Sequence, residues 1–401
     1  MRYSRLQKII VSLAVLLLLS ASLAGCGLAR NIMQESSQPE PTAENTLTAM
    51  PRINEAIVKA LKAGEPKLRL DVTVSDDDLK DIMENLSPFW GSPTEYRTIR
   101  TFRDVDLSTE AEAKAPQDVS RIEMKLAQSD NYYVYKAYTD AAYRIPSEQT
   151  RAAGILAALP GVLSDIKAAA AQNAGSPDYA LILAVHDWLV TNLSYDDTID
   201  ELSYHNGVYG ALIEHRTMCL GYAEALQLIL LCMGEQEVQM VVGKGNSDVG
   251  GNPDGWIGHA WNLVELNGDL LHVDATFDDP VSSDPNEKAS LSHIYFGQND
   301  AFMKKDHEWA ADYYPVADGG DYYYFRENGL YTESKKEFRK TLRNLLPKKQ
   351  LAEIEIAASG YEISDDDLQF IFSVRDDIKD IYRSFTDEGE VTIARLFFTY
   401  E

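Results

Sequence analysis

Residues 258–274 have the sequence GHAWNLVELNGDLLHVD. Apolar residues dominate both sides of Asn267-Gly268, a dipeptide that is typical of two-residue β-hairpin turns. If this dipeptide forms the turn, Leu266 faces Asp269 and the register of every further pair is fixed. The stretch therefore predicts two antiparallel strands, Ala260–Leu266 and Asp269–Asp274, joined in a defined register.

The same register brings an imidazole near a carboxylate. His259 would face Thr276, which lies two residues after Asp274 and on the same face as it. A diagonal pair of this kind is within reach of long side chains. We therefore expect the Asp274 carboxylate to orient the His259 ring.

A thiol precedes this hairpin in the chain. The apolar run from Cys219 to about Cys232 predicts a helix that Gly234 closes. The positive end of a helix stabilises a thiolate over a thiol, and a nearby imidazolium adds to that effect. Cys219 is therefore a candidate nucleophile.

Each of these residues also has an ordinary structural explanation. A cysteine in an apolar helix is commonly a small buried hydrophobe, a strand histidine is commonly a hydrogen-bonded core or surface residue, and an aspartate at a strand end commonly forms a turn. Together they supply a nucleophile, a base and an orienting group. The combination favours the functional interpretation.

Three sequence blocks resemble the signature blocks of the transglutaminase-like superfamily: CLGYA at 219–223, GHAWN at 258–262 and VDATFDD at 273–279. The resemblance extends from about Ala180 to Trp309, including His307-Glu308-Trp309. It implies an α+β fold with a papain-like core, in which a helix bearing the cysteine packs on an antiparallel sheet. It also implies a Cys219, His259, Asp274 catalytic triad and an acyl-thioester intermediate.

One position departs from the papain pattern. Papain-type enzymes place a glutamine of the oxyanion hole several residues before the cysteine, where this chain has Ile213 and Glu214. The backbone N–H of Cys219 can supply one donor. By analogy with the aromatic donor of transglutaminases, the candidates for a second donor are Tyr204, His205, Asn206 and Tyr209.

The first residues predict export and lipid anchoring. A basic start, the apolar run Ile9–Leu19 and the sequence Leu-Ala-Gly before Cys26 have the order of a signal peptide. The last part resembles the bacterial lipobox, which implies cleavage before Cys26 and lipid attachment to its thiol. We expect a signal peptide over 1–25, a flexible tether over 26–50, and location on the extracytoplasmic face of the cell membrane.

The rest of the chain divides into three regions. An N-terminal α/β region is expected over 51–150, the transglutaminase-like core over 151–315, and a C-terminal α+β region over 316–401. Strands are predicted in the first region at Leu68–Val74, Tyr96–Phe102, Ile122–Leu126 and Tyr132–Tyr138, with a helix opening at Ser75. Further helices are predicted at Ala152–Gln172, from Ser176 to about Asn192 and at Lys335–Lys349, and a strand at Val391–Thr399.

The net charge of the chain and the spacing of its potential metal ligands argue against some classes of partner. Lys and Arg total 37 against 63 Asp and Glu, a formal charge of −26, which disfavours binding to nucleic acid. The sequence has no HExxH, paired CxxC or calcium-loop spacing, so we expect no metal and no cofactor. Besides Cys26, only Cys219 and Cys232 remain, on one predicted helix, where a disulfide between them is geometrically doubtful.

The function expected is a cysteine peptidase, amidase or transglutaminase that acts on amide or peptide carbonyls. Its partner would be a peptide or protein substrate, for which cell-wall peptides are natural candidates. The sequence leaves open whether the thioester passes to water or to an amine. The alternative is a non-catalytic surface binding or scaffold lipoprotein that keeps the same fold.

Overall fold

The computed structural model describes parts of residues 52–77, the strands at 106–109 and 120–125, and residues 129–401 apart from gaps at 201–202, 235–236, 247–254, 280–290 and 348–350. Three sequence predictions lie outside the described residues. They are the signal and tether segments over 1–50, most of the helix after Ser75, and the strand at Tyr96–Phe102.

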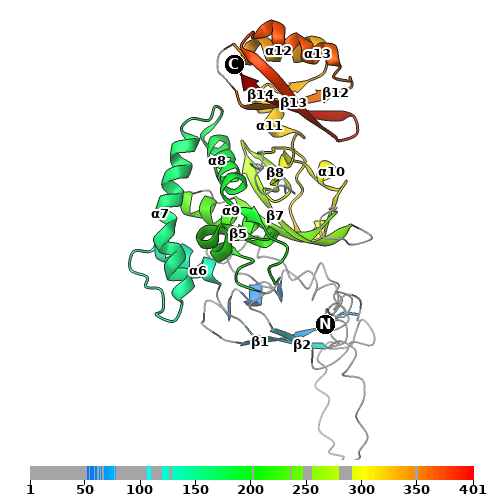
Figure 1. Cartoon of the computed structure of the whole chain (residues 1–401). Helices are drawn as coiled ribbons and strands as arrows, with labels where there is room; N and C mark the ends of the chain where they lie inside the picture. Colours follow the sequence, from blue (N-terminus) through cyan, green and yellow to red (C-terminus); the bar gives the residue numbers. More distant parts are fainter. Residues whose placement is uncertain are drawn as a thin grey trace, which may run out of the picture. The chain divides into compact units, whose positions relative to one another are not determined.

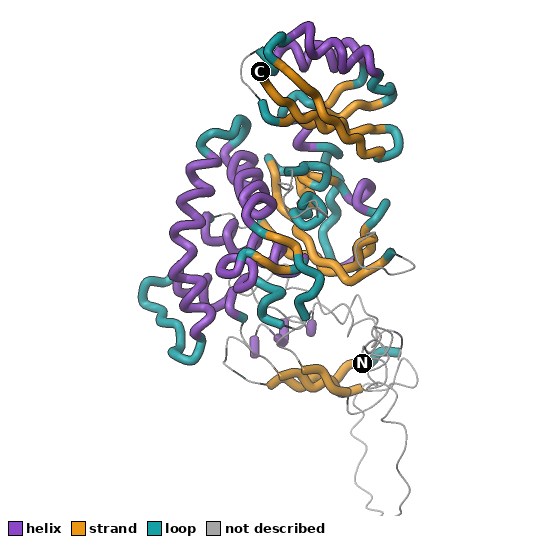
Figure 2. The backbone as a smooth tube through the Cα atoms, viewed as in Figure 1, coloured by secondary structure: helices purple, strands orange, loops and turns teal. Residues whose placement is uncertain are grey.

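A five-stranded antiparallel sheet is the platform on which the helices pack (Figures 1 and 2). Its strand order is β10-β6-β7-β8-β9, and every neighbouring pair is antiparallel. The sheet contains β6 (Val238–Asn246), β7 (Trp256–Leu266), β8 (Asp269–Val273), β9 (Phe296–Gln298) and β10 (His307–Trp309).

The predicted hairpin register is confirmed where the strands pair. Leu266 faces Asp269, and the pairing continues in register to Asn262 and Val273. Asn267 and Gly268 have φ angles of 55° and 93°, as a two-residue turn of type I′ requires.

The predicted pairing of His259 with Thr276 is wrong. Strand β8 ends at Val273, so the β7–β8 ladder stops at Asn262 and does not reach His259. His259 pairs only across the other edge of β7, with Gly243 of β6. The cause is local, because the Asp274 carboxylate accepts hydrogen bonds from the Thr276 and Phe277 N–H groups. Such side-chain bonds replace a strand ladder with a turn.

Helix α9 packs on the sheet, and three further helices pack on α9 or on one another (Figure 1). Helix α9 contacts β6 and β7 directly, and α8 contacts α9. Their bounds are α6 Asp130–Thr139, α7 Thr150–Ala170, α8 Pro177–Asn192 and α9 Cys219–Met233. Nearly all of α9 is buried, as expected of a helix that is apolar on all sides.

The helices predicted after residue 150 form close to their expected positions. The Ser176 side chain caps α8 by accepting from the Tyr179 N–H, and Pro177 occupies the first turn. Gly234 closes α9 with a φ of 101°. Within the described residues, α7 is the one helix long and apolar enough to cross a membrane, and its inner apolar side chains, such as Ile155 and Leu159, lie in the core.

The strand predicted at Tyr132–Tyr138 is wrong, because this segment is helix α6. Aromatic and β-branched residues favour strands, which explains the prediction. The side chain of Ser129 instead caps a helix by accepting from the Tyr132 N–H, and Val134 packs into the same apolar cluster as α7, α8 and α9. Tertiary packing therefore overrides the local preference.

A second sheet lies in the C-terminal part of the chain. Its order is β11-β12-β14-β13, and it carries two helices. The elements are β11 Tyr331–Thr332, α12 Lys335–Leu345, β12 Glu353–Ser359, α13 Asp365–Val374, β13 Ile378–Asp387 and β14 Val391–Tyr400. The helix from Lys335 and the strand from Val391 were predicted, although α12 ends earlier than expected.

The two sheets share an apolar cluster. Trp261 and Leu263 of β7 belong to the same buried cluster as Ile356 of β12 and Leu396 of β14. The short helix α10 (Asp300–Met303) joins β9 to β10, and the segment from β10 to β11 forms the short helices η2 (Ala311–Tyr313) and α11 (Tyr323–Glu327).

A small antiparallel sheet precedes these parts, with order β1-β3-β2. Its strands are β1 Lys67–Val72, β2 Asp106–Thr109 and β3 Ser120–Lys125. The strands predicted at Leu68–Val74 and Ile122–Leu126 are confirmed. Taken together, the described residues have a mixed α and β fold with mainly antiparallel sheets, in agreement with the α+β prediction.

Candidate active site

Cys219 is the first residue of α9, as the sequence predicted. The parallel strands β4 (Ser194–Tyr195) and β5 (Arg216–Thr217) hold the chain just before it. Met218 precedes the helix in an extended conformation and provides no capping oxygen. The residue that carries the thiol therefore lies at the positive end of the helix, and 8% of the Cys219 surface stays exposed.

The His259 ring joins the thiol to a carboxylate. Its Nε2 atom lies 2.5 Å from Asp274 Oδ2, and the ring is also hydrogen-bonded to Cys219. Because Asp274 uses Nε2, Nδ1 is the nitrogen left to face the sulfur. The structure thus brings Cys219, His259 and Asp274 together in the order thiol, imidazole, carboxylate.

Asp274 is held by four hydrogen bonds. Its Oδ1 atom accepts from the backbone N–H groups of Thr276 (2.9 Å) and Phe277 (3.1 Å). Its Oδ2 atom accepts from His259 and, over 3.0 Å, from His307 Nε2. Both oxygens are fully used, so the carboxylate has a fixed orientation.

These contacts set the charges of the pair. Burial alone would lower the pKa of His259, but the Asp274 carboxylate and the contact with Cys219 raise it to about 10. Burial would raise the pKa of Asp274, and the two imidazoles instead hold that pKa well below its usual value. An imidazolium beside a carboxylate is therefore the form favoured at neutral pH.

His307 is a member of this site to which the sequence assigned no role. Its Nδ1 atom lies 2.6 Å from Asp306 Oδ1, while its Nε2 atom binds Asp274. The ring is 1% exposed. The block that contains His307 was part of the family resemblance, but only folding places β10 beside the Asp274 turn.

Aromatic rings enclose the imidazole. Trp261 stacks on His259 with centroids 5.7 Å apart, and the Phe277 centroid lies at 4.7 Å. The Trp261 Nε1–H donates to His272 Nδ1 over 2.9 Å, and His272 Nε2 lies 2.9 Å from Asp300. Since Nδ1 accepts, His272 is a neutral ring, in line with burial lowering its pKa.

The oxyanion candidates lie just before the short helix η1 (Gly210–Glu214), which leads through β5 to α9. The Thr217 hydroxyl donates to the His205 carbonyl over 3.0 Å, which ties this loop to the residues preceding Cys219. His205 Nδ1 pairs with Glu214, Tyr204 is 42% exposed and packs on Tyr209 and His205, and Asn206 is buried. A donor role for any of the four stays a prediction.

Cys232 lies at the other end of α9 and provides a contrast. Both cysteines of the described chain are free, as the doubtful geometry of a bridge had suggested. Burial raises the pKa of the Cys232 thiol to about 12. This thiol has the properties of a structural residue.

No protein-family model matches the chain, and no curated protein matches it either. Among solved structures, a crystal structure of a TGase is 12% identical with TM-score 0.28, and the match covers 57% of this chain and 56% of that one. A candidate cysteine protease from Cytophaga hutchinsonii is 12% identical with TM-score 0.24, covering 43% and 62%. A candidate protease from Parabacteroides distasonis is 10% identical with TM-score 0.22, covering 84% and 66%. The match spans less than two thirds of each of these structures, and likeness at such TM-scores carries no weight for the site.

Proposed function

We propose that this chain is a surface-anchored cysteine enzyme that acts on amide or peptide carbonyls through a thioester on Cys219. The observation that carries the proposal is the continuous contact from Cys219 to His259 and from His259 to Asp274. The resemblance of the three sequence blocks to the transglutaminase-like superfamily supports the same chemistry.

The first half of the reaction breaks the amide. The Cys219 thiolate attacks the carbonyl carbon, and the helix end and the Cys219 N–H stabilise the negative oxygen that forms. As the C–N bond breaks, the His259 imidazolium donates its proton to the leaving nitrogen. An amine departs, and the acyl group stays on sulfur.

The second half releases the acyl group. His259, now neutral, removes a proton from water or from an incoming amine, whose oxygen or nitrogen bonds to the acyl carbon. The C–S bond then breaks, which restores the thiolate and the imidazolium. Asp274 keeps its charge throughout and holds Nδ1 toward the sulfur.

The thiols provide a direct test on the full chain in detergent. Iodoacetamide labelling across pH, measured by mass spectrometry, should modify Cys219 rapidly with a midpoint well below about 8.5. Cys232 serves as an internal control and should label slowly. The variant His259→Ala should slow labelling at Cys219 and leave the labelling of Cys232 unchanged. If both thiols label slowly, and the His259→Ala variant labels at the same rate as the wild type, the result favours a binding or scaffold protein.

Turnover is tested separately. A mixture of cell-wall peptides and glutamine-containing peptides, with and without a fluorescent primary amine, distinguishes hydrolysis from transfer. Cys219→Ala should abolish either product while circular dichroism stays unchanged. Persistent turnover in that variant contradicts the proposal.

The membrane anchor is part of the proposal and is tested on its own. Cells fed an alkyne fatty acid should label the protein in the membrane fraction. Cys26→Ser should lose that label and its membrane retention, since stable anchoring requires more than one acyl chain. Equal labelling of Cys26→Ser excludes this residue as the lipid site.

A further inference from the structure

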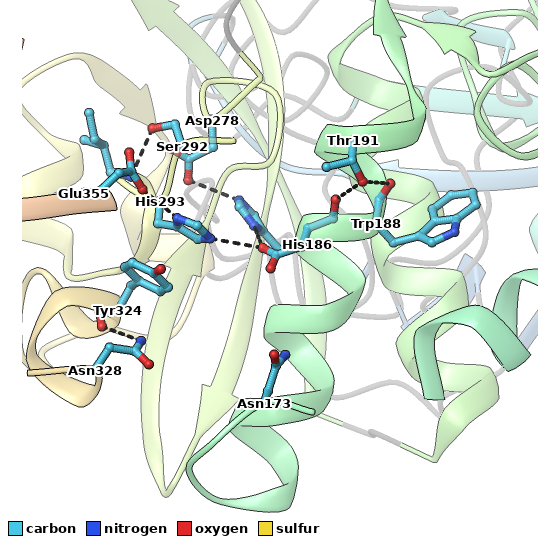
Figure 3. Close-up of polar contacts among 12 residues, drawn as sticks. Asn173, His186, Trp188, Thr191, Asp278, Ser292, His293, Tyr324, Asn328 and Glu355 are labelled. Carbon is cyan, nitrogen blue, oxygen red and sulfur yellow. Dashed lines mark hydrogen bonds and ion pairs between the residues drawn. The ribbon is translucent and has the colours of Figure 1, made fainter. Parts of the chain in front are cut away.

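A second histidine cluster lies where α8 meets the segment before β9 (Figure 3). His186 and Asp187 are neighbours in α8, and His293 comes from the segment that leads into β9. Asp187 Oδ1 lies 3.0 Å from His186 Nδ1 and 3.2 Å from His293 Nε2. The three ligand-type atoms all lie within 4.8 Å of one another.

A carboxylate backs the outer nitrogen of each imidazole. His186 Nε2 lies 3.1 Å from Asp278 Oδ2, and His293 Nδ1 lies 2.6 Å from Glu355 Oε2. Histidines that ligate a metal almost always donate their other ring N–H to such a group, which fixes the tautomer. In the structure, His186 Nδ1 and His293 Nε2 are both hydrogen-bonded to Asp187 Oδ1. Loss of the protons on these two nitrogens, with the outer nitrogens still protonated, would leave both lone pairs on the side where Asp187 lies.

The rings and their backing groups are rigidly held. His293 stacks on Tyr324 with centroids 3.7 Å apart and planes 2° apart, and Arg395 binds Glu355 over 2.8 Å. Asp278 also accepts from the Tyr295 N–H. A preformed and supported donor set lowers the cost of binding an ion.

The charge of the cluster is compatible with a divalent cation. Burial would lower the pKa of both imidazoles, but the carboxylates bonded to them raise it, for His293 to about 10. Without an ion, the two imidazoliums and the Arg395 guanidinium balance the three carboxylates, in a region where His186 and Asp278 are fully buried. A divalent cation that displaces one proton from each imidazole keeps this balance, and the Asp187 side chain is 30% exposed.

Ligand spacing separates this cluster from the candidate active site. Two ligands around tetrahedral zinc, each at about 2.0–2.1 Å from the ion, lie about 3.3 Å apart. The spacings of 3.0 and 3.2 Å at Asp187 are close to that value. The 2.5 Å contact between His259 and Asp274 is too short for two ligands of one ion and is a hydrogen bond.

We propose that His186 Nδ1, Asp187 Oδ1 and His293 Nε2 bind a divalent transition-metal ion, and that zinc is the ion this donor set fits best. Two nitrogens and one carboxylate oxygen with an open fourth position are typical of zinc sites. No metal is predicted from the sequence, because the ligands have none of the usual spacings and Asp187 and His293 are 106 residues apart. The bound ion would join α8 to the β9 segment and, through Glu355, to β12.

The test uses the untagged full chain in detergent with Cys219→Ser, so that the active-site thiol cannot bind metal. After treatment with a chelator, titration with zinc sulfate should show one ion per chain by calorimetry and by elemental analysis. His186→Gln and His293→Gln should each abolish stoichiometric binding. Glu355→Gln, which alters only a backing group, should weaken binding by roughly 10–100-fold.

His215→Asn is the matched control, because this histidine is exposed and its φ of 54° suits asparagine. It should bind zinc as the parent chain does. Zinc should also raise the melting temperature of the parent and of His215→Asn but not that of His293→Gln. Each variant is compared with and without zinc, so that a lower starting stability of the variant does not obscure the effect. Absence of stoichiometric binding in the parent, or binding that persists in the double variant His186→Gln/His293→Gln, overturns the proposal and leaves a set of imidazolium–carboxylate ion pairs.

Discussion

His307 and His259 donate hydrogen bonds to the same atom, Oδ2 of Asp274, over 3.0 and 2.5 Å. His307 is in turn fixed by Asp306. The position of the His259 ring therefore depends on a residue that does not reach the thiol, and His307 acts as a positioning residue for the proposed reaction.

Removing the hydrogen bond from His307 should lower the reactivity of the Cys219 thiol while leaving the three triad residues in place. We expect His307→Phe to slow Cys219 alkylation roughly tenfold, because a hydrogen bond to a charged group contributes about 1.5–3 kcal/mol and part of this orients His259. The neighbouring rings of Phe277 and Trp261 can accommodate the phenyl group. The pH profile of iodoacetamide labelling measures the effect.

Two further variants show whether the effect is specific. Glu308→Gln changes the exposed neighbour on β10 and should label like the wild type. His307→Gln restores a donor and should recover part of the rate. Equal rates for His307→Phe and the wild type contradict a positioning role.

Asp274→Asn should lower the pKa of His259 from about 10 toward its ordinary value of 6.5. The carboxylate favours the protonated ring, and the neutral amide does not. Histidine NMR titration in a Cys219→Ser background measures this shift directly. In the wild type, the stability that the charged pair provides is fully present below pH 6.5 and is lost as the pH rises through about 10, and this loss should be absent from Asp274→Asn.

Gly245→Ala should disturb the same ring from the other side. A Cβ at this position on β6 would lie 2.8 Å from Phe277 Cζ and 3.3 Å from His259 Cδ2. We expect slower Cys219 labelling, because Phe277 must move and it packs against His259. Gly258→Ala is the matched control, since a Cβ there meets nothing within 4 Å. If Cys219 labels at the same rate in both variants, close packing at Gly245 does not affect the reactivity of the thiol.

Local chemistry explains what the sequence could predict. The Asn267-Gly268 turn fixes a register that depends on two adjacent residues, and Ser176-Pro177 starts α8 by the same kind of local rule. The start of α9 at Cys219 was predicted for the same reason. Patterns of this kind need no information from distant parts of the chain.

What could not be predicted depends on contacts between distant segments. Helix α6 forms because Val134 packs against other helices, although its own residues favour a strand. His307 meets Asp274 across 33 residues, and His293 meets Asp187 across 106. The clustering of all seven histidines between His186 and His307 was the one available signal, and it does not say which side chains meet.

Asp279 makes the stability depend on pH in the direction opposite to most carboxylates. Burial raises its pKa to about 6, and the hydrogen bond that Tyr222 donates only partly offsets this. Between pH 3.8 and 6 the folded chain keeps a proton that the unfolded chain releases, so the free energy of unfolding falls as the pH rises, by about 3 kcal/mol in all. Asp279→Asn should remove this fall in urea unfolding at several pH values. Tyr222→Phe removes a hydrogen bond that lowers the pKa of Asp279, so the free energy of unfolding should continue to fall to a higher pH in this variant. If both variants show the pH dependence of the wild type, Asp279 is not its source.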